Sequence, residues 1–328
     1  MGLDPAVAAV RSAVRGVLPG PGEVALVACS GGADSLALLA ATVFEARRDA
    51  VRVVGAVVDH GLQAGSAEHT ARVVEQMAGL GVDETATIRV TVDPGPGGIE
   101  AGAREARYAA LGQLAEHVGA GTVLLGHTLD DQAETVLLGL ARGSGGRSLQ
   151  GMRRSFDLDG VRAVRPLLGL TRQQTEAACT AEGITWWDDP QNEDRAFTRS
   201  RIRHTVMPVL ERELGPGVAQ ALARTADQLR TDMGDLEERA LGALDEARIE
   251  GGIDPGDLEC TSPAVFGRVL RMAAVEAGAI ASELTFEHVQ AIRSARPGKE
   301  IRLPGHVTAY REGEWRILFK PTPSLSDE

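Results

Sequence analysis

Cysteine is scarce in this sequence. Cys29, Cys179 and Cys260 are odd in number, lie far apart and form no C-x-x-C pair. Disulfide frameworks, zinc sites and iron–sulfur clusters depend on paired or closely spaced cysteines. The cysteine pattern therefore argues against all three kinds of site.

Long hydrophobic runs are missing as well. No apolar stretch approaches the ~18 residues that a membrane-spanning helix needs. The N-terminal segment MGLDPAVAAVRSAVRG is interrupted by Asp4, Arg11 and Arg15, so it lacks the apolar core of a signal peptide. We expect a soluble, cytoplasmic protein that does not bind a membrane.

Positive charge is in deficit, and lysine is nearly absent. The formal net charge of −12 by itself disfavours a nucleic-acid partner. However, seven arginines stand against two aspartates between Arg142 and Arg172, and a second basic cluster covers 195–204. Only Lys299 and Lys320 are lysines, so the chain uses arginine for nearly all of its basic residues, and a high arginine content is not by itself evidence of a binding site. The clustering gives modest support for a phosphate-rich partner.

The first half of the chain alternates between two kinds of segment. At 328 residues and 43% hydrophobic, the chain is long enough for a sizeable core and for two domains. Short, β-prone apolar segments are expected to form strands at 23–28, 51–58, 86–92 and 121–126. The stretches that follow them are expected to form helices at about 34–48, 66–80, 99–118 and 130–141. This alternation predicts an α/β fold with a doubly wound, Rossmann-like parallel sheet.

The second half loses this alternation. Residues 161–168 are expected to give one more strand and 171–182 a helix. From Gly217 to about Arg248 the apolar residues repeat at steps of three and four, which predicts one long amphipathic helix. A small α/β domain is expected after this helix, and WRILFK near the C-terminus is expected to form its last strand.

The stretch ACSGGADSLALLA (28–40) indicates a strand, a tight glycine turn and a helix. A loop of this kind directs backbone N–H groups and a helix N-terminus at an anion, most naturally a phosphate. Neither the Walker pattern nor the dinucleotide G-x-G-x-x-G pattern is present, and a Gly-Gly turn is often only a turn. Asp34 would place a carboxylate beside that anion, which suggests a Mg²⁺ ion between them.

A second motif, GHTLDDQAETVLL (126–138), follows the fourth expected strand. Acids near a helix N-terminus stabilise the helix dipole by ~0.3–1 kcal/mol each, so capping is one explanation. Three carboxylates and His127 exceed what capping requires. Asp131 and Glu134 share a helical face, and strand ends meet at one edge of a parallel sheet. With Asp34 they predict a Mg²⁺ site.

The SGGADS loop resembles that of the PP-loop, or ATP-pyrophosphatase, superfamily, whose members cleave ATP between its α and β phosphates. Further motifs are similar to the tRNA(Ile)-lysidine synthetase family, in its shorter form: VDHGL (58–62), AREARY (103–108), GHTLDDQAET, RGSGGRSLQGM (142–152), RPLL (165–168), DDPQN (188–192), SRIRHTVMPVL (200–210) and GKEIRLPGHVTAYR (298–311). The resemblance covers nearly the whole chain. Two departures are the absence of a further C-terminal domain found in longer relatives and DDPQN in place of a DxSN-like stretch, which puts a role for Asn192 in doubt.

The resemblance implies a reaction. The wobble cytidine of an isoleucine tRNA with a CAU anticodon would become lysidine, with ATP and free L-lysine as co-substrates. ATP would adenylate the C2 oxygen of the cytidine, and the lysine ε-amine would then displace AMP. Residues 1–215 would form the PP-loop catalytic domain, and 216–328 the long helix and a tRNA-recognition domain. A homodimer is a further expectation.

The resemblance also implies roles for individual residues. Those expected to contact ATP are Ser30, Gly31, Gly32, Ala33, Asp34, Ser35, Asp59 and His127. Those expected to act in catalysis are Asp34, His127, Asp131, Glu134 and Arg201, with Mg²⁺ held by Asp34, Asp131 and Glu134. Those expected to contact tRNA are Arg104, Arg107, Arg147, Arg153, Arg203, Lys299 and Arg302.

Simpler explanations remain open for several of these residues. His127 is nearly as well explained as a structural histidine, Asp59 as a turn former, and Lys299 as a solvated partner of Glu300. Trp186 and Trp187 are adjacent, so at least one of them is expected in the core even if the other stacks on a base.

Other functions also remain open. A tRNA thiolase is one, although such enzymes commonly use paired cysteines. An amidotransferase-linked synthetase is another, although no glutaminase domain is evident. A nucleotide sensor without chemistry would have no need of the carboxylates at 130–134.

Overall fold

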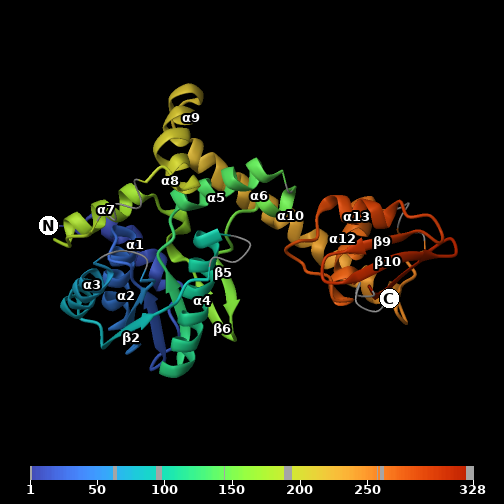
Figure 1. The fold of residues 1–328 in the computed structure, drawn as a ribbon. Coiled ribbons are helices and arrows are strands. Elements are labelled where there is room, and N and C mark those ends of the chain that lie inside the picture. Colours follow the sequence, from blue (N-terminus) through green and yellow to red (C-terminus); the bar gives the residue numbers. More distant parts are fainter. Residues whose placement is uncertain are drawn as a thin grey trace. The chain divides into compact units, whose positions relative to one another are not determined.

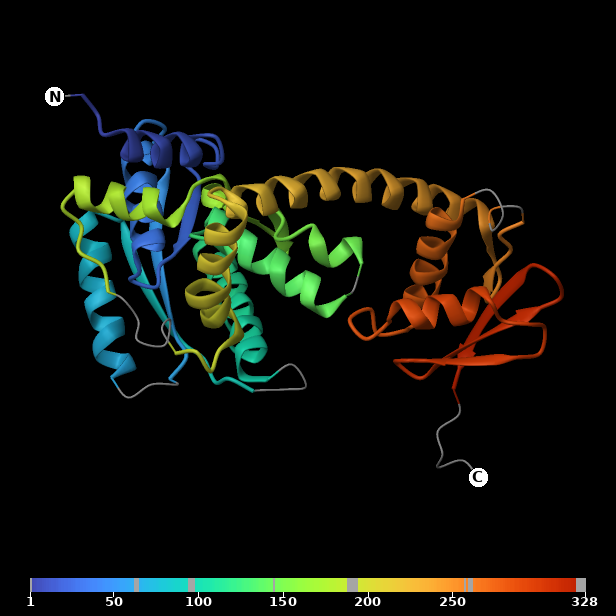
Figure 2. The same cartoon turned by 90° about the horizontal axis from the view of Figure 1, so that it is seen from above.

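The computed structural model describes residues 2–61, 65–93, 98–143, 145–187, 194–256, 258 and 262–322. The chain forms two compact units (Figures 1 and 2). The first comprises Met1–Leu138 and Gly151–Arg224, and the second comprises Gly139–Gln150 and Thr225–Glu328. The division falls inside the long helix α10 (Val218–Ala247), whereas the sequence analysis placed it just before that helix, between 215 and 216.

The first unit contains a six-stranded sheet in the order β3-β2-β1-β4-β6-β5. The strands are β1 (Val24–Ala28), β2 (Arg52–Asp59), β3 (Glu84–Arg89), β4 (Ala120–Leu125), β5 (Ser155–Leu158) and β6 (Val161–Val164). All neighbouring pairs are parallel except β5 with β6. The predicted doubly wound parallel sheet is therefore confirmed.

Helices cover both faces of this sheet. The central strands are continuous apolar runs such as VALVA in β1, which is typical of parallel strands buried on both sides. Four helices pack together on one face: α1 (Pro5–Arg15), α2 (Ala33–Ala46), α3 (Ser66–Leu80) and α7 (Arg172–Ala181). The other face is covered by α4 (Gly98–Val118).

The remaining elements of the first unit lie around the carboxyl edge and beyond it. They are α5 (Leu129–Arg142), a 3₁₀ turn (Pro166–Gly169), α8 (Thr198–Arg201), a π-helical turn (Ile202–Val206) and α9 (Met207–Leu214). Three features of this unit were not predicted: α1, the edge strand β5, and the helical run over 198–214.

The second unit contains an antiparallel sheet with helices packed against it. The sheet order is β7-β8-β11-β10-β9. Its strands are β7 (Arg248–Ile249), β8 (Gly252–Ile253), β9 (Glu300–Leu303), β10 (Val307–Glu312) and β11 (Arg316–Pro321), and its helices are α6 (Gly146–Leu149), α12 (Pro263–Glu276) and α13 (Phe286–Arg293). Phe266 and Leu270 of α12, Leu244 of α10 and Ile317 of β11 lie in its core. The predicted C-terminal α/β domain and its last strand are confirmed.

The topology fixes where a ligand can bind in the first unit. The chain runs from β1 toward β3 on one side and from β4 toward β5 on the other. Ligands of such sheets bind beyond the carboxyl ends of the strands at this switch point. The loops after β1 and β4 meet there. No helix in the described ranges is both long enough and apolar enough to span a bilayer.

Candidate active site

The loop after β1 needs glycine at its tightest point. Gly31 has φ of +83°, in the left-handed region that favours glycine. A Cβ at this position would lie 2.6 Å from Val73 Cγ2 and 3.1 Å from His69 Cε1, both on α3. The backbone of the loop is thus pressed against α3, and no larger residue fits.

Hydrogen bonds inside the loop hold its shape. The Ser35 hydroxyl donates to the Gly32 carbonyl oxygen (2.9 Å) and accepts the Ser30 backbone N–H (3.1 Å). Gly32 is the N-cap of α2 and supplies no side-chain acceptor. The first N–H groups of this 14-residue helix therefore remain for an outside anion. Ser35 itself is buried and serves the loop.

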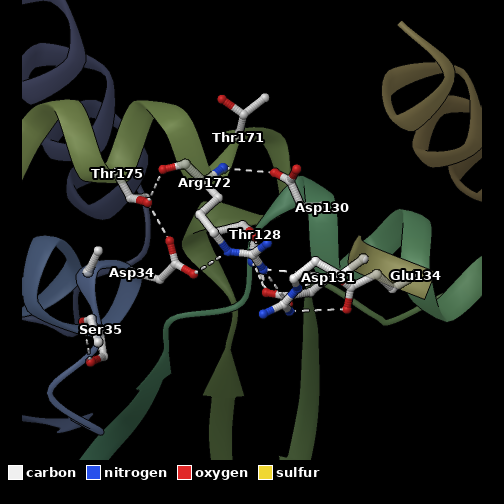
Figure 3. Close-up of polar contacts among 12 residues, drawn as sticks. Asp34, Ser35, Thr128, Asp130, Asp131, Glu134, Thr171, Arg172 and Thr175 are labelled. Atoms are coloured by element: carbon white, nitrogen blue, oxygen red, sulfur yellow. Dashed lines mark hydrogen bonds and ion pairs between the residues drawn. The ribbon is translucent and has the colours of Figure 1, made fainter. Parts of the chain in front are cut away.

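Asp34 lies in the first turn of α2 and is held by α7. The Thr175 hydroxyl donates a hydrogen bond to Asp34 Oδ1, and Arg172 Nε lies 3.6 Å from Asp34 Oδ2 (Figure 3). Burial raises the pKa of Asp34 to about 6, although Arg172 and Thr175 oppose that shift. This carboxylate is therefore costly to keep ionised unless a cation stands beside it.

Asp131 divides its two oxygens between a helix cap and two arginines. Its Oδ2 accepts the backbone N–H (2.8 Å) and the hydroxyl (3.1 Å) of Thr128 at the start of α5. Its Oδ1 accepts Arg172 Nη2 (3.1 Å) and Arg203 Nη2 (3.2 Å). Burial alone would raise the pKa of Asp131, but Arg172, His127 and the Thr128 N–H outweigh it, and the pKa is lowered. Capping thus explains one oxygen of Asp131 and leaves the other for the site.

Glu134, one turn further along α5, is bound by Arg203. Arg203 Nε lies 2.7 Å from Oε1 and Nη2 lies 3.2 Å from Oε2. The Glu134 side chain is 2% exposed, and burial raises its pKa although Arg203 opposes the shift. Arg203 belongs to the π-helical turn before Pro208. Proline cannot donate to the carbonyl four residues earlier, and a wider turn accommodates it.

The start of α7 brings Arg172 to these acids. Thr171 caps the helix, its hydroxyl accepting the Gln174 N–H while the Gln174 side chain accepts the Thr171 N–H. Arg172 is then the first helical residue, and its backbone N–H donates to Asp130 Oδ2 (2.8 Å). The N–H groups in the first turn of a helix have no acceptor within the helix, and Asp130 supplies one for the first turn of α7. Neither Arg172 nor Thr175 was identified from the sequence.

A second set of basic residues surrounds His127, just after β4. Arg104 and Arg107 of α4 lie 5.0 and 5.7 Å from the Tyr108 ring. Arg165, which is 5% exposed, donates to the Tyr108 hydroxyl (3.0 Å). Burial lowers the pKa of His127. The charge of Asp131 opposes this shift and the three arginines add to it, so the imidazole is neutral. Its Nδ1 has no hydrogen-bond partner among the described residues.

Comparisons with known proteins agree with this arrangement. A family model described as a PP-loop domain matches residues 11–210. The tRNA(Ile)-lysidine synthase of Salinispora arenicola is 48% identical over 330 residues, which cover 98% of this chain and 98% of that protein. The tRNA(Ile)-lysidine synthase of Streptomyces coelicolor is 46% identical and covers 95% of this chain and 98% of its own length. This chain belongs to the tRNA(Ile)-lysidine synthase family.

A solved structure shares the fold. The U34-tRNA thiolase of Methanococcus maripaludis, described with its [4Fe-4S] cluster, superposes with a TM-score of 0.56. It is 15% identical in sequence, and the match covers 68% of this chain and 78% of that one. At this identity the likeness concerns the fold alone. The lysidine synthase relatives, by contrast, match the second unit as well as the first.

With the family known, the structure can be compared with the residues expected in the ATP and metal sites. Asp34, Asp131 and Glu134 do come together, but Arg172 and Arg203 lie among them. Among the described residues, no group of three or more His, Cys, Asp or Glu side chains is arranged to hold a metal ion. Guanidinium groups bind the three carboxylates in this structure, and the role of these residues in holding Mg²⁺ stays a prediction.

Two other expected site residues are engaged elsewhere. One oxygen of Asp59 accepts the Gly61 N–H (2.9 Å), and the other accepts Arg89 (3.0 and 3.1 Å), which is the contact pattern of a turn former. Arg201 donates to the carbonyl oxygens of Arg195 and Ala196 and to the Thr198 hydroxyl. Arg203, expected to contact tRNA, binds the carboxylates, whereas the expectation had placed Arg201 in catalysis.

The residues expected to contact tRNA are spread over both units. In the first, Arg153 is exposed. In the second, Arg147 is half exposed with its Nε 3.8 Å from Glu237, and Arg302 and Lys299 are exposed. Glu300, the expected partner of Lys299, pairs with Lys320 instead. The DDPQN stretch with Asn192, and Cys260, lie outside the described residues.

Two pockets lie close to these elements in the first unit. One of about 190 Å³ is lined by Asp130, Glu134, Arg172, Arg203, Met207, Pro208, Glu211 and Ala219. The other, of about 450 Å³, is lined by His69, Arg72, Glu75, Gln76, Trp186 and Trp187. Trp187 stacks against His69 with ring centroids 4.0 Å apart, and Trp186 packs on the core. The expectation that one of the two tryptophans is in the core is consistent with this arrangement.

Proposed function

We propose that this chain catalyses the ATP-dependent joining of free L-lysine to C2 of the wobble cytidine of tRNA(Ile) with a CAU anticodon. The observation that carries the proposal is the sequence identity of 46–48% to tRNA(Ile)-lysidine synthases, over matches that include both units. The products are lysidine, AMP and pyrophosphate, so the enzyme is a ligase that forms a carbon–nitrogen bond.

The PP-loop supports the first step. The cytidine O2 attacks the α-phosphorus of ATP, the bond to the bridging oxygen breaks, and pyrophosphate leaves. The N–H groups at the start of α2, next to Gly31 and Gly32, are placed to receive the departing charge. Ser30 lies at the mouth of the loop, and Ser35 keeps it in shape. In the second step the lysine ε-nitrogen attacks C2, AMP leaves, and the amine loses a proton.

The carboxylates fit a Mg²⁺ ion that is shared with the nucleotide. Mg²⁺ is usually bound by one or two carboxylates together with substrate phosphates rather than by a full protein cage. Asp34 and Asp131 supply two hard oxygen ligands beside the loop. When bound, Mg²⁺ would offset the negative charge that develops on the phosphates. Glu134 is less suited to be a ligand, because Arg203 binds both of its oxygens.

The basic cluster at His127 suits the base and its phosphate. Arg104 and Arg107 have no carboxylate partner among the described side chains, so their charges remain for an RNA phosphate or the AMP group. The neutral imidazole of His127 has a buried Nδ1 that meets no partner in the described part of the chain, so this atom can form a hydrogen bond with the cytidine or the α-phosphate. This favours a ligand-binding role over the purely structural one.

The pocket of about 190 Å³ offers a place for lysine. Asp130 and Glu211 present carboxylates to an ammonium group, and Arg203 adds a guanidinium that can face a carboxylate. Met207 and Pro208 add apolar surface for the methylene chain. The expected homodimer and the cytoplasmic location stay predictions.

A thiolase is the main competing function. In this chain, however, Cys29 and Cys179 are buried, and burial raises the pKa of both thiols, to about 12 for Cys179. Such thiols are protonated and poor nucleophiles. The shared fold with a thiolase does not weigh against this, because the fold is common to many chemistries.

Mass analysis of nucleosides tests the proposal directly. Unmodified tRNA(Ile) is incubated with the protein, ATP, Mg²⁺ and isotopically labelled lysine, and then digested. We expect labelled lysidine together with AMP. Asp34→Asn and Asp131→Asn should reduce its formation by about 100-fold or more, whereas Asp157→Asn, on the exposed edge strand β5, should not. Thiolated cytidine, or nucleotide binding without AMP release, would refute the proposal.

A further inference from the structure

Arg172 contacts the acidic residues that follow both β1 and β4. Its Nη2 lies 3.1 Å from Asp131 Oδ1 and 3.9 Å from Glu134 Oε1, and its Nε lies 3.6 Å from Asp34 Oδ2. Its backbone N–H donates to Asp130 (2.8 Å). Figure 3 shows the guanidinium between Asp34 on one side and Asp131 on the other. One side chain from α7 thus joins the motif after β1 to the motif after β4.

Three of the four oxygens of Asp34 and Asp131 already accept a hydrogen bond, and the fourth, Asp34 Oδ2, is paired with the Arg172 guanidinium. Thr175 and Arg172 bind those of Asp34. Thr128 and the two arginines bind those of Asp131. Two carboxylates at this depth repel one another unless a positive charge lies between them. Arg172 supplies that charge, in the place where a metal ion would do so.

A guanidinium and a Mg²⁺ ion cannot bind the same oxygens at once. Mg²⁺ requires oxygen ligands at about 2.0–2.1 Å in near-octahedral geometry, and two cations in contact with one carboxylate oxygen repel each other. Arginine also pairs well with phosphate, through two parallel N–H donors. Asp34 belongs to the first turn of α2, so Arg172 already lies beside the loop that would hold a triphosphate.

We propose that Arg172 is an exchangeable cation: it neutralises Asp34 and Asp131 in the nucleotide-free enzyme and moves to the triphosphate when Mg²⁺ takes its place. This proposal rests on the proposed function, because it requires a Mg²⁺–ATP substrate. It makes Arg172 a positioning residue for the acids and then a ligand of ATP. Mg²⁺ alone should bind weakly to the free enzyme, since ATP is needed to draw Arg172 away.

The test is binding of Mg²⁺ in the absence of nucleotide. The full-length protein and its Arg172→Gln variant are titrated with MgCl₂ at constant ionic strength, and binding is measured by calorimetry and by the rise in melting temperature. A parallel NaCl series controls for screening. Removal of the competing cation should tighten binding of Mg²⁺ alone by about tenfold or more, and should weaken binding of ATP in saturating Mg²⁺ by a similar factor.

Arg203→Gln is the matched control. Arg203 also binds Asp131, but it does not contact Asp34 within ion-pair distance in the described structure. We expect a clearly smaller gain in Mg²⁺ binding from this variant, because Arg203 shares only Asp131 with the proposed Mg²⁺ site. If Arg172→Gln does not fold by circular dichroism, Arg172→Lys replaces it, because a single ammonium cannot span the same two carboxylates and should give a smaller gain.

Two results would overturn the proposal. One is a folded Arg172 variant that binds Mg²⁺ alone no better than the unaltered protein. The other is an equal gain in the Arg203→Gln variant, which would mean that any lost positive charge has the same effect. Neither depends on lysidine formation, so a failure of the proposed function, seen as unmodified tRNA with the unaltered enzyme, is distinguished from a failure of this inference.

Discussion

Gly31→Ala should destabilise the first unit, whereas Gly32→Ala should not. At Gly31, φ is +83°, and a new Cβ would meet Val73 Cγ2 at 2.6 Å and His69 at 3.1 Å. A left-handed backbone costs a non-glycine residue about 1–2 kcal/mol, and overpacking costs about 1–3 kcal/mol more. We therefore expect Gly31→Ala to lower the free energy of unfolding by about 2–5 kcal/mol.

The neighbouring glycine provides the control. Gly32 has φ of −79°, and a Cβ there would have the Ser30 hydroxyl oxygen as its nearest neighbour, at an ordinary 3.7 Å. Reduced entropy of the unfolded chain favours alanine by about 0.4–1 kcal/mol. Alanine is strongly disfavoured relative to glycine at the N-cap, which opposes this by about 0.5–1 kcal/mol. Gly32→Ala should therefore be close to neutral.

Urea unfolding followed by tryptophan fluorescence measures both variants. The chain has three tryptophans, of which Trp186 and Trp187 belong to the first unit and Trp315 to the second. A Trp315→Phe background restricts the signal to the first unit. Unfolding free energies come from linear extrapolation. If Gly31→Ala stays within 0.5 kcal/mol of its parent, or Gly32→Ala loses as much, the argument from the left-handed backbone and the contact with α3 fails.

Three further outcomes are expected. Cys29→Ala should retain lysidine formation within about threefold, since burial keeps this thiol protonated and small apolar packing is its role; a loss of turnover in the folded variant would revive the thiolase. The double variant Lys299→Ala with Arg302→Ala should weaken tRNA binding and reduce the salt dependence of log K by about one per lost phosphate contact, with ATP affinity unchanged; an unaltered salt slope would remove these residues from recognition. A backbone N–H and Arg89 hold the pKa of Asp59 below its usual range, so its ionised form stabilises the fold above about pH 4 and loses this effect as the pH falls through the lowered pKa. The stability deficit of Asp59→Asn should accordingly shrink from pH 7 to pH 3, and an equal deficit at both pH values would contradict that reasoning.

The sheet of the first unit and the carboxyl edge that carries the site could be predicted from the sequence. Parallel strands buried on both faces are continuous apolar runs, and VALVA in β1 and VLL in β4 stand out for that reason. Because the carboxyl ends of parallel strands meet at one edge of the sheet, the SGGADS loop after β1 and Asp131 after β4 were expected to lie together. The edge strand β5 escaped notice because it has four residues, SFDL, and is only partly buried. The run over 198–214 is rich in arginine and leaves few side chains buried, so a buried core face could not be read from it.

The partners of the acids were decided by the tertiary structure. Thr175 and Asp34 are 141 residues apart, and only the packing of α7 against α2 brings them into contact. The choice between Arg201 and Arg203 depends on helical phase, and a π-helical turn changes that phase in a way that residue spacing does not reveal.

In the second unit, too, the tertiary structure decided which charged residues form a pair. Glu300 is the first residue of β9 and Lys299 precedes the strand, so the two residues are neighbours in sequence without being strand partners. The register of β9, β10 and β11 instead brings Lys320 to Glu300. The sequence by itself determined the central strands of the first unit, the phosphate loop and the acids, because these follow from local patterns. Pairings between distant segments depend on how elements pack and in which register, and only the folded chain decides them.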